Sequence, residues 1–136
     1  MLDIVFETSR FAISLPQGQP GPFVPFGKDV IQWLIQQLQA HGVQSLSTYE
    51  DGDGYEMEAR HGSTIYLIAV RGRRASTPGS ADDAIWRIIV RKQRSLLERA
   101  LGKNRMTSTD PLLWMIESAL HAEKDITNVR REPTAA

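Results

Sequence analysis

The sequence predicts an α+β fold, a two-layer sandwich in which a mostly antiparallel sheet of four to six strands packs against two main helices on one face. Two segments, 29–41 and 111–123, carry apolar residues at helical spacing. Several β-rich runs joined by short links lie between them, and sequential strands with short links usually pair antiparallel. We therefore expect one domain over residues 1–132, followed by a frayed tail over 133–136.

The N-terminal part is predicted to be a strand followed by a loop. Residues 3–15 are rich in β-branched and aromatic side chains, and Ser9 and Arg10 interrupt this run. We expect a bulge or a short hairpin at the interruption. Residues 16–27 contain closely spaced prolines and glycines, which excludes regular structure there.

The first main helix is predicted over 29–41. Its apolar residues form a single stripe, because they lie at i, i+1, i+4, i+5 and i+8: Val30, Ile31, Leu34, Ile35 and Leu38. Asp29 lies in the first turn, where the helix dipole favours a carboxylate, and Gly42 offers a left-handed C-terminal cap.

A β-meander is predicted after this helix, with strands over 43–49, 55–60, 63–71 and 85–92. Acidic residues and glycines form a turn signal between the first two strands. The third strand is apolar on both faces, which is typical of a central strand. Residues 72–83 are polar and are expected to form a loop.

The C-terminal third contains two helix-start signals. Ser95 and Glu98 have the spacing of a capping box, which predicts a short helix over 96–101. Thr109 or Asp110, followed by proline, marks the start of the second main helix, since proline is favoured at the first helical position. A short edge strand is expected over residues 126–131.

The predicted core combines the apolar stripes of the helices with one face of the sheet. Trp33, Trp86 and Trp114 each lie beside such a stripe, and packing in the core or an interface explains them without a ligand. The residues expected in the core are Val30, Ile31, Leu34, Ile35, Leu38, Met57, Ile65, Leu67, Ile85, Ile89, Leu97, Leu113, Ile116 and Leu120.

The composition excludes several classes of protein. The chain has 136 residues and no cysteine, so it has no disulfide framework, thiol nucleophile or zinc–thiolate site. The longest uncharged stretch, residues 11–27, contains four prolines and three glycines and is unsuited to crossing a membrane. The acidic N-terminus lacks the basic lead of a signal peptide. We expect a cytoplasmic protein without a membrane partner.

The charge is zero overall but unevenly distributed. Residues 1–70 hold three basic groups against eight acidic ones, residues 71–105 hold ten against three, and residues 106–136 hold three against five. The three blocks therefore carry −5, +7 and −2. Such asymmetry favours association with a partner protein or with a second copy of the chain.

No sequence pattern assigns a catalytic residue, a cofactor or a metal. The nucleophile elbow, the phosphate-binding loop and the dinucleotide fingerprint are all absent. The acidic turn that begins at Asp51 lacks the later ligands of a calcium loop, and the three histidines are dispersed. Glu56 and Glu58 share one side of a strand, which fits a solvent face better than a pair of catalytic acids.

The candidate interaction residues are two aromatic side chains and two basic clusters. Phe23 and Phe26 lie in the proline-rich loop, where one of them fits a hydrophobic staple and both could contact a partner. The basic residues end two consecutive predicted strands, and antiparallel pairing places the two clusters at opposite ends of the ribbon. They are Arg71, Arg73 and Arg74 in one cluster and Arg91, Lys92 and Arg94 in the other.

The chain also resembles small bacterial α+β proteins of unknown function. The resemblance covers roughly residues 22–105 and is carried by the Pro-Phe-Gly-Lys-Asp-Val segment, the Trp-Leu pair of the first helix, the Trp-Arg-Ile-Ile-Val strand and the Arg-Ser-Leu-Leu-Glu segment that ends at Glu98. It implies a bacterial source and a stand-alone domain, and it transfers no catalytic residue.

Three functions remain open from the sequence. The first is a non-enzymatic protein–protein interaction module, either chaperone-like or immunity-like by analogy of size and class, or a homodimer. The second is binding of nucleic acid or a phosphate ligand through the basic segment 71–105, which is less favoured because the net charge is zero and aromatic side chains are scarce there. The third is a small enzyme that uses Glu56 or His61.

Overall fold

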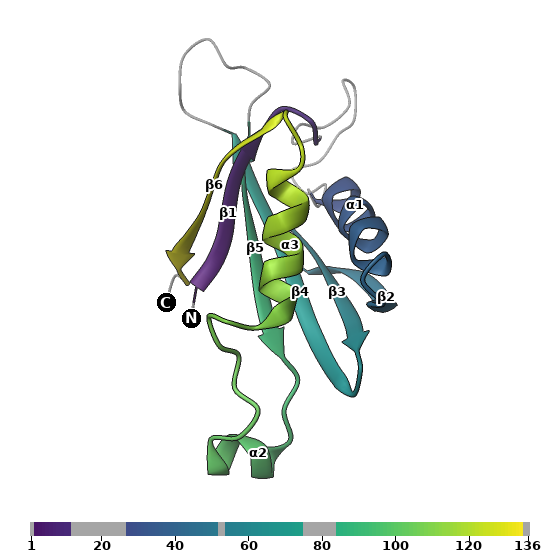
Figure 1. The fold of residues 1–136 in the computed structure, drawn as a ribbon, viewed down its shortest axis with the longest axis vertical. Coiled ribbons are helices and arrows are strands. Elements are labelled where there is room, and N and C mark those ends of the chain that lie inside the picture. The colour runs from purple at the N-terminus through teal and green to yellow at the C-terminus, as the bar shows by residue number, and fades with distance from the viewer. Residues whose placement is uncertain (1, 12–26, 52–53, 75–83, 135–136) are drawn as a thin grey trace.

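Over the residues that the structure describes, the fold is α+β, with a six-stranded antiparallel sheet and three helices (Figure 1). The computed structural model describes residues 2–11, 27–51, 54–74 and 84–134. The strand order is β2-β3-β4-β5-β1-β6. In chain order the elements are β1 (Leu2–Thr8), α1 (Lys28–Gln39), β2 (Gln44–Asp51), β3 (Gly54–His61), β4 (Thr64–Arg74), β5 (Ala84–Lys92), α2 (Leu96–Leu101), α3 (Pro111–His121) and β6 (Ile126–Pro133).

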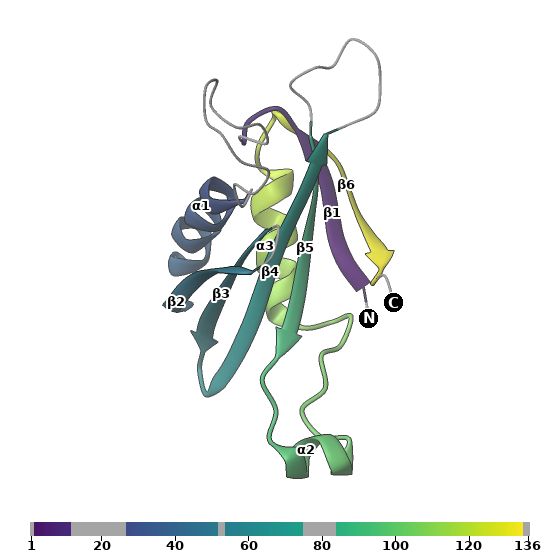
Figure 2. The same cartoon turned by 180° about the vertical axis from the view of Figure 1, so that it is seen from behind.

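The meander predicted from the sequence is present. Strands β2 to β5 pair with their sequence neighbours, and β6 is an edge strand as expected. Strand β1 lies between β5 and β6, with Val5 opposite both Arg87 and Arg130. The two ends of the described chain therefore lie side by side (Figures 1 and 2).

The N-terminal strand predicted over residues 3–15 is present in its first part. Strand β1 ends at Thr8, and the chain bends over residues 9–11. The Ser9–Arg10 interruption thus ends β1, while residues 12–15, on which the expected bulge or hairpin also depends, lie outside the described residues. Most of the predicted loop, together with Phe23 and Phe26, lies outside the described residues.

Strand β4 is longer than predicted, because residues 72–74 belong to the strand and not to a loop. Gly72, which favours a loop in the sequence, lies directly opposite Trp86. A Cβ atom on Gly72 would overlap the ring of Trp86. The glycine therefore makes room for a tryptophan on the neighbouring strand, a role that glycine often has inside sheets.

In β4 and β5, the buried face is the one opposite to the face that was expected to lie in the core. Tyr66, Ile68, Val70, Trp86, Ile88 and Val90 are buried. The expected core residues Ile65, Leu67, Ile85 and Ile89 lie at the alternate positions and are only half-buried. Both faces of these strands are apolar, so the period of two could not distinguish them. The larger aromatic side chains occupy the core.

The expected core is confirmed elsewhere, with two exceptions. Val30, Ile31, Leu34, Leu38, Met57, Leu113, Ile116 and Leu120 are buried. Ile35 is half-buried against the core cluster. Leu97 is exposed, and for this residue the prediction is wrong. Trp114, expected in the core or at an interface, is also exposed and lies outside the core.

The choice of face can be tested with two matched substitutions on β5. We expect Ile88→Val to lower the free energy of unfolding by about 1 kcal/mol, because it removes a methyl group from a fully buried side chain. Ile89→Val should cost less than about 0.5 kcal/mol, because Ile89 lies on the other face. Urea unfolding measures both, and equal losses would contradict the assignment of the core face.

The N-cap residue of helix α3, Asp110, links this helix to the sheet. The helix passes in front of the central strands in Figure 1 and behind them in Figure 2. The N-cap is Asp110, whose carboxylate accepts a hydrogen bond from the Leu112 N–H at 2.9 Å. The same carboxylate accepts from the Tyr66 hydroxyl at 2.9 Å and lies 3.1 Å from the Lys92 ammonium. The predicted start of this helix is confirmed at Asp110.

In the part of the chain that the structure describes, no helix has the length and apolar character needed to cross a membrane.

Candidate functional site

The first candidate site is an arm, defined as residues 94–105, that connects β5 to the segment before α3. Figure 1 shows α2, the helix of this arm, standing away from the sheet and from the other two helices. None of the six residues of α2 is buried. The arm therefore holds a helix that makes no use of the core for its stability.

Both ends of α2 are capped by local hydrogen bonds. The Glu98 N–H donates to the Ser95 hydroxyl at 3.1 Å, and the Ser95 N–H donates to the Glu98 carboxylate at 3.0 Å, which completes the predicted capping box. Gly102 ends the helix in the left-handed conformation, and the Lys103 N–H donates to the Glu98 carbonyl at 2.8 Å. The short helix is therefore capped at both ends without any buried residue.

The cap also responds to pH in a defined direction. The hydrogen bond from the Ser95 backbone lowers the pKa of Glu98. A carboxylate with a lowered pKa stabilises the folded arm above the usual range for glutamate. This contribution is lost as the pH falls through the lowered value.

The exposed face of α2 is apolar. Leu96, Leu97, Ala100 and Leu101 lie at i, i+1, i+4 and i+5, the spacing of one helical stripe. The exposed fractions of the three leucines are 84%, 68% and 58%. In α1 the same spacing is buried against the sheet, whereas in α2 it faces outward. We call these four residues the leucine stripe.

The surroundings of the leucine stripe are basic. The arm carries Arg94, Arg99, Lys103 and Arg105 against one acidic residue, Glu98, which the capping box already uses. The Arg94 guanidinium donates to the Lys103 carbonyl at 3.3 Å and so joins the two ends of the arm. The arm therefore combines an apolar stripe with an excess of positive charge.

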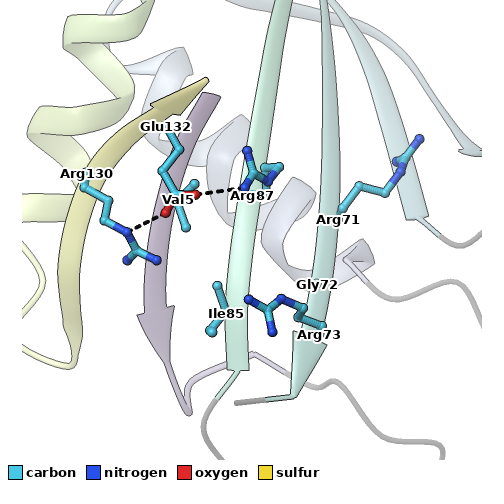
Figure 3. Close-up of a pocket in the computed structure, with 8 residues that line it drawn as sticks. All are labelled: Val5, Arg71, Gly72, Arg73, Ile85, Arg87, Arg130 and Glu132. Atoms are coloured by element: carbon cyan, nitrogen blue, oxygen red, sulfur yellow. Dashed lines mark hydrogen bonds and ion pairs between the residues drawn. The ribbon is translucent and has the colours of Figure 1, made fainter. Parts of the chain in front are cut away.

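The second candidate site is a depression of about 330 Å³ on the half-exposed face of the sheet. It lies where β4, β5, β1 and β6 run next to one another, and Figure 3 shows its lining. The lining residues are Val5, Arg71, Gly72, Arg73, Ile85, Arg87, Arg130 and Glu132. We call this the arginine depression.

Two of its arginines are held by carboxylates. Arg87 contacts the buried carboxylate of Asp3 at 2.8 Å and that of Glu132 at 3.1 Å. The Nε atom of Arg130 contacts the other Glu132 oxygen at 2.6 Å, and Arg130 also lies 3.4 Å from Glu7. These contacts with Arg130 and Arg87 lower the pKa of Glu132. The ion pairs fix both guanidiniums in position across three strands.

The other two arginines of the depression, Arg71 and Arg73, come from β4 and are not held by Glu132. The Arg71 guanidinium points away from the centre of the depression in Figure 3 and lies 3.7 Å from Glu56. The Arg73 guanidinium lies beside Ile85 in the same view. Among the residues that the structure describes, Arg73 forms no hydrogen bond or ion pair, and its side chain is exposed.

The two predicted basic clusters do lie at opposite ends of the ribbon. Arg71 is opposite Arg87, whereas Arg91 is opposite Leu67 near the other end of β4. Arg91 is exposed, Lys92 is occupied by Asp110, and Arg94 belongs to the arm. Arg74 is the last residue of β4. The candidate residues therefore contribute to two separate surfaces.

Sequence reasoning missed two groups of functional candidates. Arg130 enters the depression because β6 pairs with β1, a long-range neighbour that no local pattern indicates. The leucine stripe shows helical periodicity in the sequence, but periodicity does not reveal whether the stripe is covered.

The residues considered for catalysis are engaged in the sheet or dispersed. The Tyr49 hydroxyl donates to the Glu56 carboxylate at 2.8 Å, and Arg71 lies on its other side. His61 is the last residue of β3. Within residues 2–11, 27–51, 54–74 and 84–134, no group of three or more histidine, aspartate or glutamate side chains is placed to hold a metal ion.

Comparison with protein-family models, with curated proteins and with solved structures finds no significant match to this chain.

Proposed function

We propose that the protein is a protein-binding module and that the arm is its contact surface. The observation that carries this proposal is the leucine stripe, three leucines that are more than half exposed on a helix with both ends capped. Burial of a leucine side chain contributes roughly 1.5–3 kcal/mol. A helix that only connected β5 to α3 would gain nothing from three leucines turned outward.

The arrangement matches one recurrent mode of recognition, in which a helix lays its apolar face into a groove of a partner. Because α2 is already folded, little conformational entropy is lost when a partner covers it. The helix is short, so the basic side chains that flank it extend the contact beyond the stripe.

The charge of the arm defines the chemistry of the partner. Four basic residues flank the leucine stripe, so the complementary surface is an apolar groove with carboxylates at its rim. A second copy of the chain is the alternative occupant, because residues 1–70 carry a net charge of −5. In either case the charge complementarity makes the association weaken as salt rises.

The proposal includes the layering of the fold. We place α1 and α3 on the same face of the sheet, which leaves the face of the arginine depression uncovered. This layering is supported by the single core cluster that joins Val30, Ile116 and Ile88, one residue each from α1, α3 and β5. It is also supported by the edge contact between His41 and Trp114, whose ring centroids are 6.1 Å apart.

The triple substitution Leu96→Ser, Leu97→Ser and Leu101→Ser tests the function. We expect it to abolish capture of the partner by the immobilised protein while changing the free energy of unfolding by less than about 1 kcal/mol, because the stripe makes no core contact. Quantitative mass spectrometry of the captured proteins measures the first effect and urea unfolding the second. Leu46→Ser, at an exposed leucine of β2, is the matched control and should retain capture.

Measurement of the oligomeric state distinguishes a different partner protein from a second copy of the chain as the molecule that binds the leucine stripe. A mass that rises with concentration for the natural chain, and that stays monomeric for the triple variant, identifies a second copy as the partner. Capture that is equal for the natural chain and the triple variant, with a monomer at every concentration, would sink the proposal.

A further inference from the structure

We propose that the arginine depression binds a small organic anion, a phosphate monoester or a carboxylate attached to a compact apolar body. This inference goes beyond protein binding through the arm, since it concerns a different surface and different residues. It rests on the free donors of the depression, on its apolar floor and on its size.

The free donors come chiefly from Arg73. A guanidinium has five N–H donors, and those of Arg73 have no acceptor among the described residues. Arg130 uses Nε and Nη1 for its contacts with Glu132, Glu7 and the Asn128 carbonyl, which leaves Nη2 without a contact in the described part of the chain. A guanidinium fork matches the oxygen spacing of both phosphate and carboxylate.

The neighbouring arginines are positioned in advance. Glu132 lies between Arg87 and Arg130 in Figure 3 and contacts both. Asp3 holds Arg87 from the side of β1. A ligand therefore meets side chains that have already lost their rotamer freedom, which lowers the entropic cost of binding.

The apolar floor of the depression is formed by Ile85, which is half-buried beside the Arg73 guanidinium. Val5 lies deeper, between Arg87 and Arg130 in the sheet, and at 1% exposure it is covered by the side chains around it. An apolar or aromatic ring can lie against Ile85 while its anionic group reaches Arg73.

Size and charge favour a small ligand over a nucleic acid. The volume of about 330 Å³ is at the lower end of the range for ligand pockets. Glu7, Glu56 and Glu132 each pair with an arginine that lines the depression, so little unpaired positive charge is left there for an extended polyanion. The other basic cluster lies at the far end of the ribbon, so no continuous track for a phosphate backbone connects them.

Titrations of the full chain with four probes test the proposal. The probes are phenyl phosphate, benzoate, inorganic phosphate and a short single-stranded oligonucleotide. Binding of each probe is measured by changes in amide chemical shifts and by calorimetry. We expect phenyl phosphate or benzoate to shift the amide signals of Arg73, Ile85 and Arg87, and to bind more tightly than inorganic phosphate because of the apolar floor. Which of the two organic probes binds more tightly identifies the anionic group.

Two matched variants complete the test. We expect Arg73→Gln to weaken binding of the organic anion by about tenfold, the value of one charge-assisted hydrogen bond. Arg91→Gln, at an exposed arginine on the same face of β5 but outside the depression, should leave binding unchanged. Equal effects of the two variants, the absence of any shift at millimolar probe, or tighter binding of the oligonucleotide with loss in both variants would each overturn the proposal.

Discussion

Replacing Trp86 with alanine is expected to lower the free energy of unfolding by about 3–5 kcal/mol, the usual cost of removing a large aromatic side chain from a core. Trp86 is completely buried at the centre of the sheet. Its ring lies across Gly72 and forms an edge contact with Phe11 at a centroid distance of 6.2 Å. Gly72, which lies against the ring, has no side chain that could fill the space.

Trp114→Ala is the matched control for this prediction. Its side chain is 62% exposed, and its ring makes an edge contact with that of His41. We expect Trp114→Ala to lower the free energy of unfolding by less than about 1 kcal/mol, which corresponds to the loss of that contact. Urea unfolding measures the effect of both substitutions. A similar loss for the two tryptophans would contradict the core described above.

Replacing Asp110 with alanine is expected to cost about 3–5 kcal/mol, because it removes one member of a buried ion pair. Asp110 caps α3, accepts from the Tyr66 hydroxyl and pairs with Lys92, whose side chain is 15% exposed. Burial and the bond to Asp110 raise the pKa of Tyr66, so the phenol remains a donor. The substitution leaves both partners without their acceptor.

Two further variants separate the contributions at this site. Asp110→Asn keeps an oxygen acceptor for the helix cap and should lose less than Asp110→Ala. Tyr66→Phe removes a single hydrogen bond and should cost about 1 kcal/mol. Thermal or urea unfolding measures all three. Equal losses for Asp110→Ala and Tyr66→Phe would show that the ion pair with Lys92 contributes nothing.

The local parts of the fold could be predicted because their signals are short in range. The capping box at Ser95 and Glu98 predicted the start of α2, Gly102 its end, and Asp110 with Pro111 the start of α3. The identity of the buried face in β5 could not be predicted from the same window. Ile85 and Trp86 are both apolar, and only the packing of helices and neighbouring strands decides which of them is covered.

The candidate sites depend on longer-range information. The separation of the Arg71 cluster from Arg91 was predicted, although Arg73 was expected in the loop and lies in β4. The companions of Arg73 in the depression are Arg87 and Arg130, which come together only because β1 lies between β5 and β6. Of the leucine stripe, Leu97 was expected in the core, yet it is exposed together with Leu96 and Leu101. Whether another part of the protein covers the stripe depends on tertiary packing, which the periodicity of the sequence does not show.

The position of β1 also determines the order in which the chain can fold during synthesis. A ribosome releases the chain from its N-terminus, so β2, β3, β4 and β5 can pair in turn as they emerge. Strand β1 emerges first, yet its two neighbours belong to the last half of the chain. Its apolar residues Ile4 and Phe6 therefore have no sheet partner until β5 and β6 have followed, so closing the sheet at β1 carries the loop-closure cost of bringing together segments far apart in the chain.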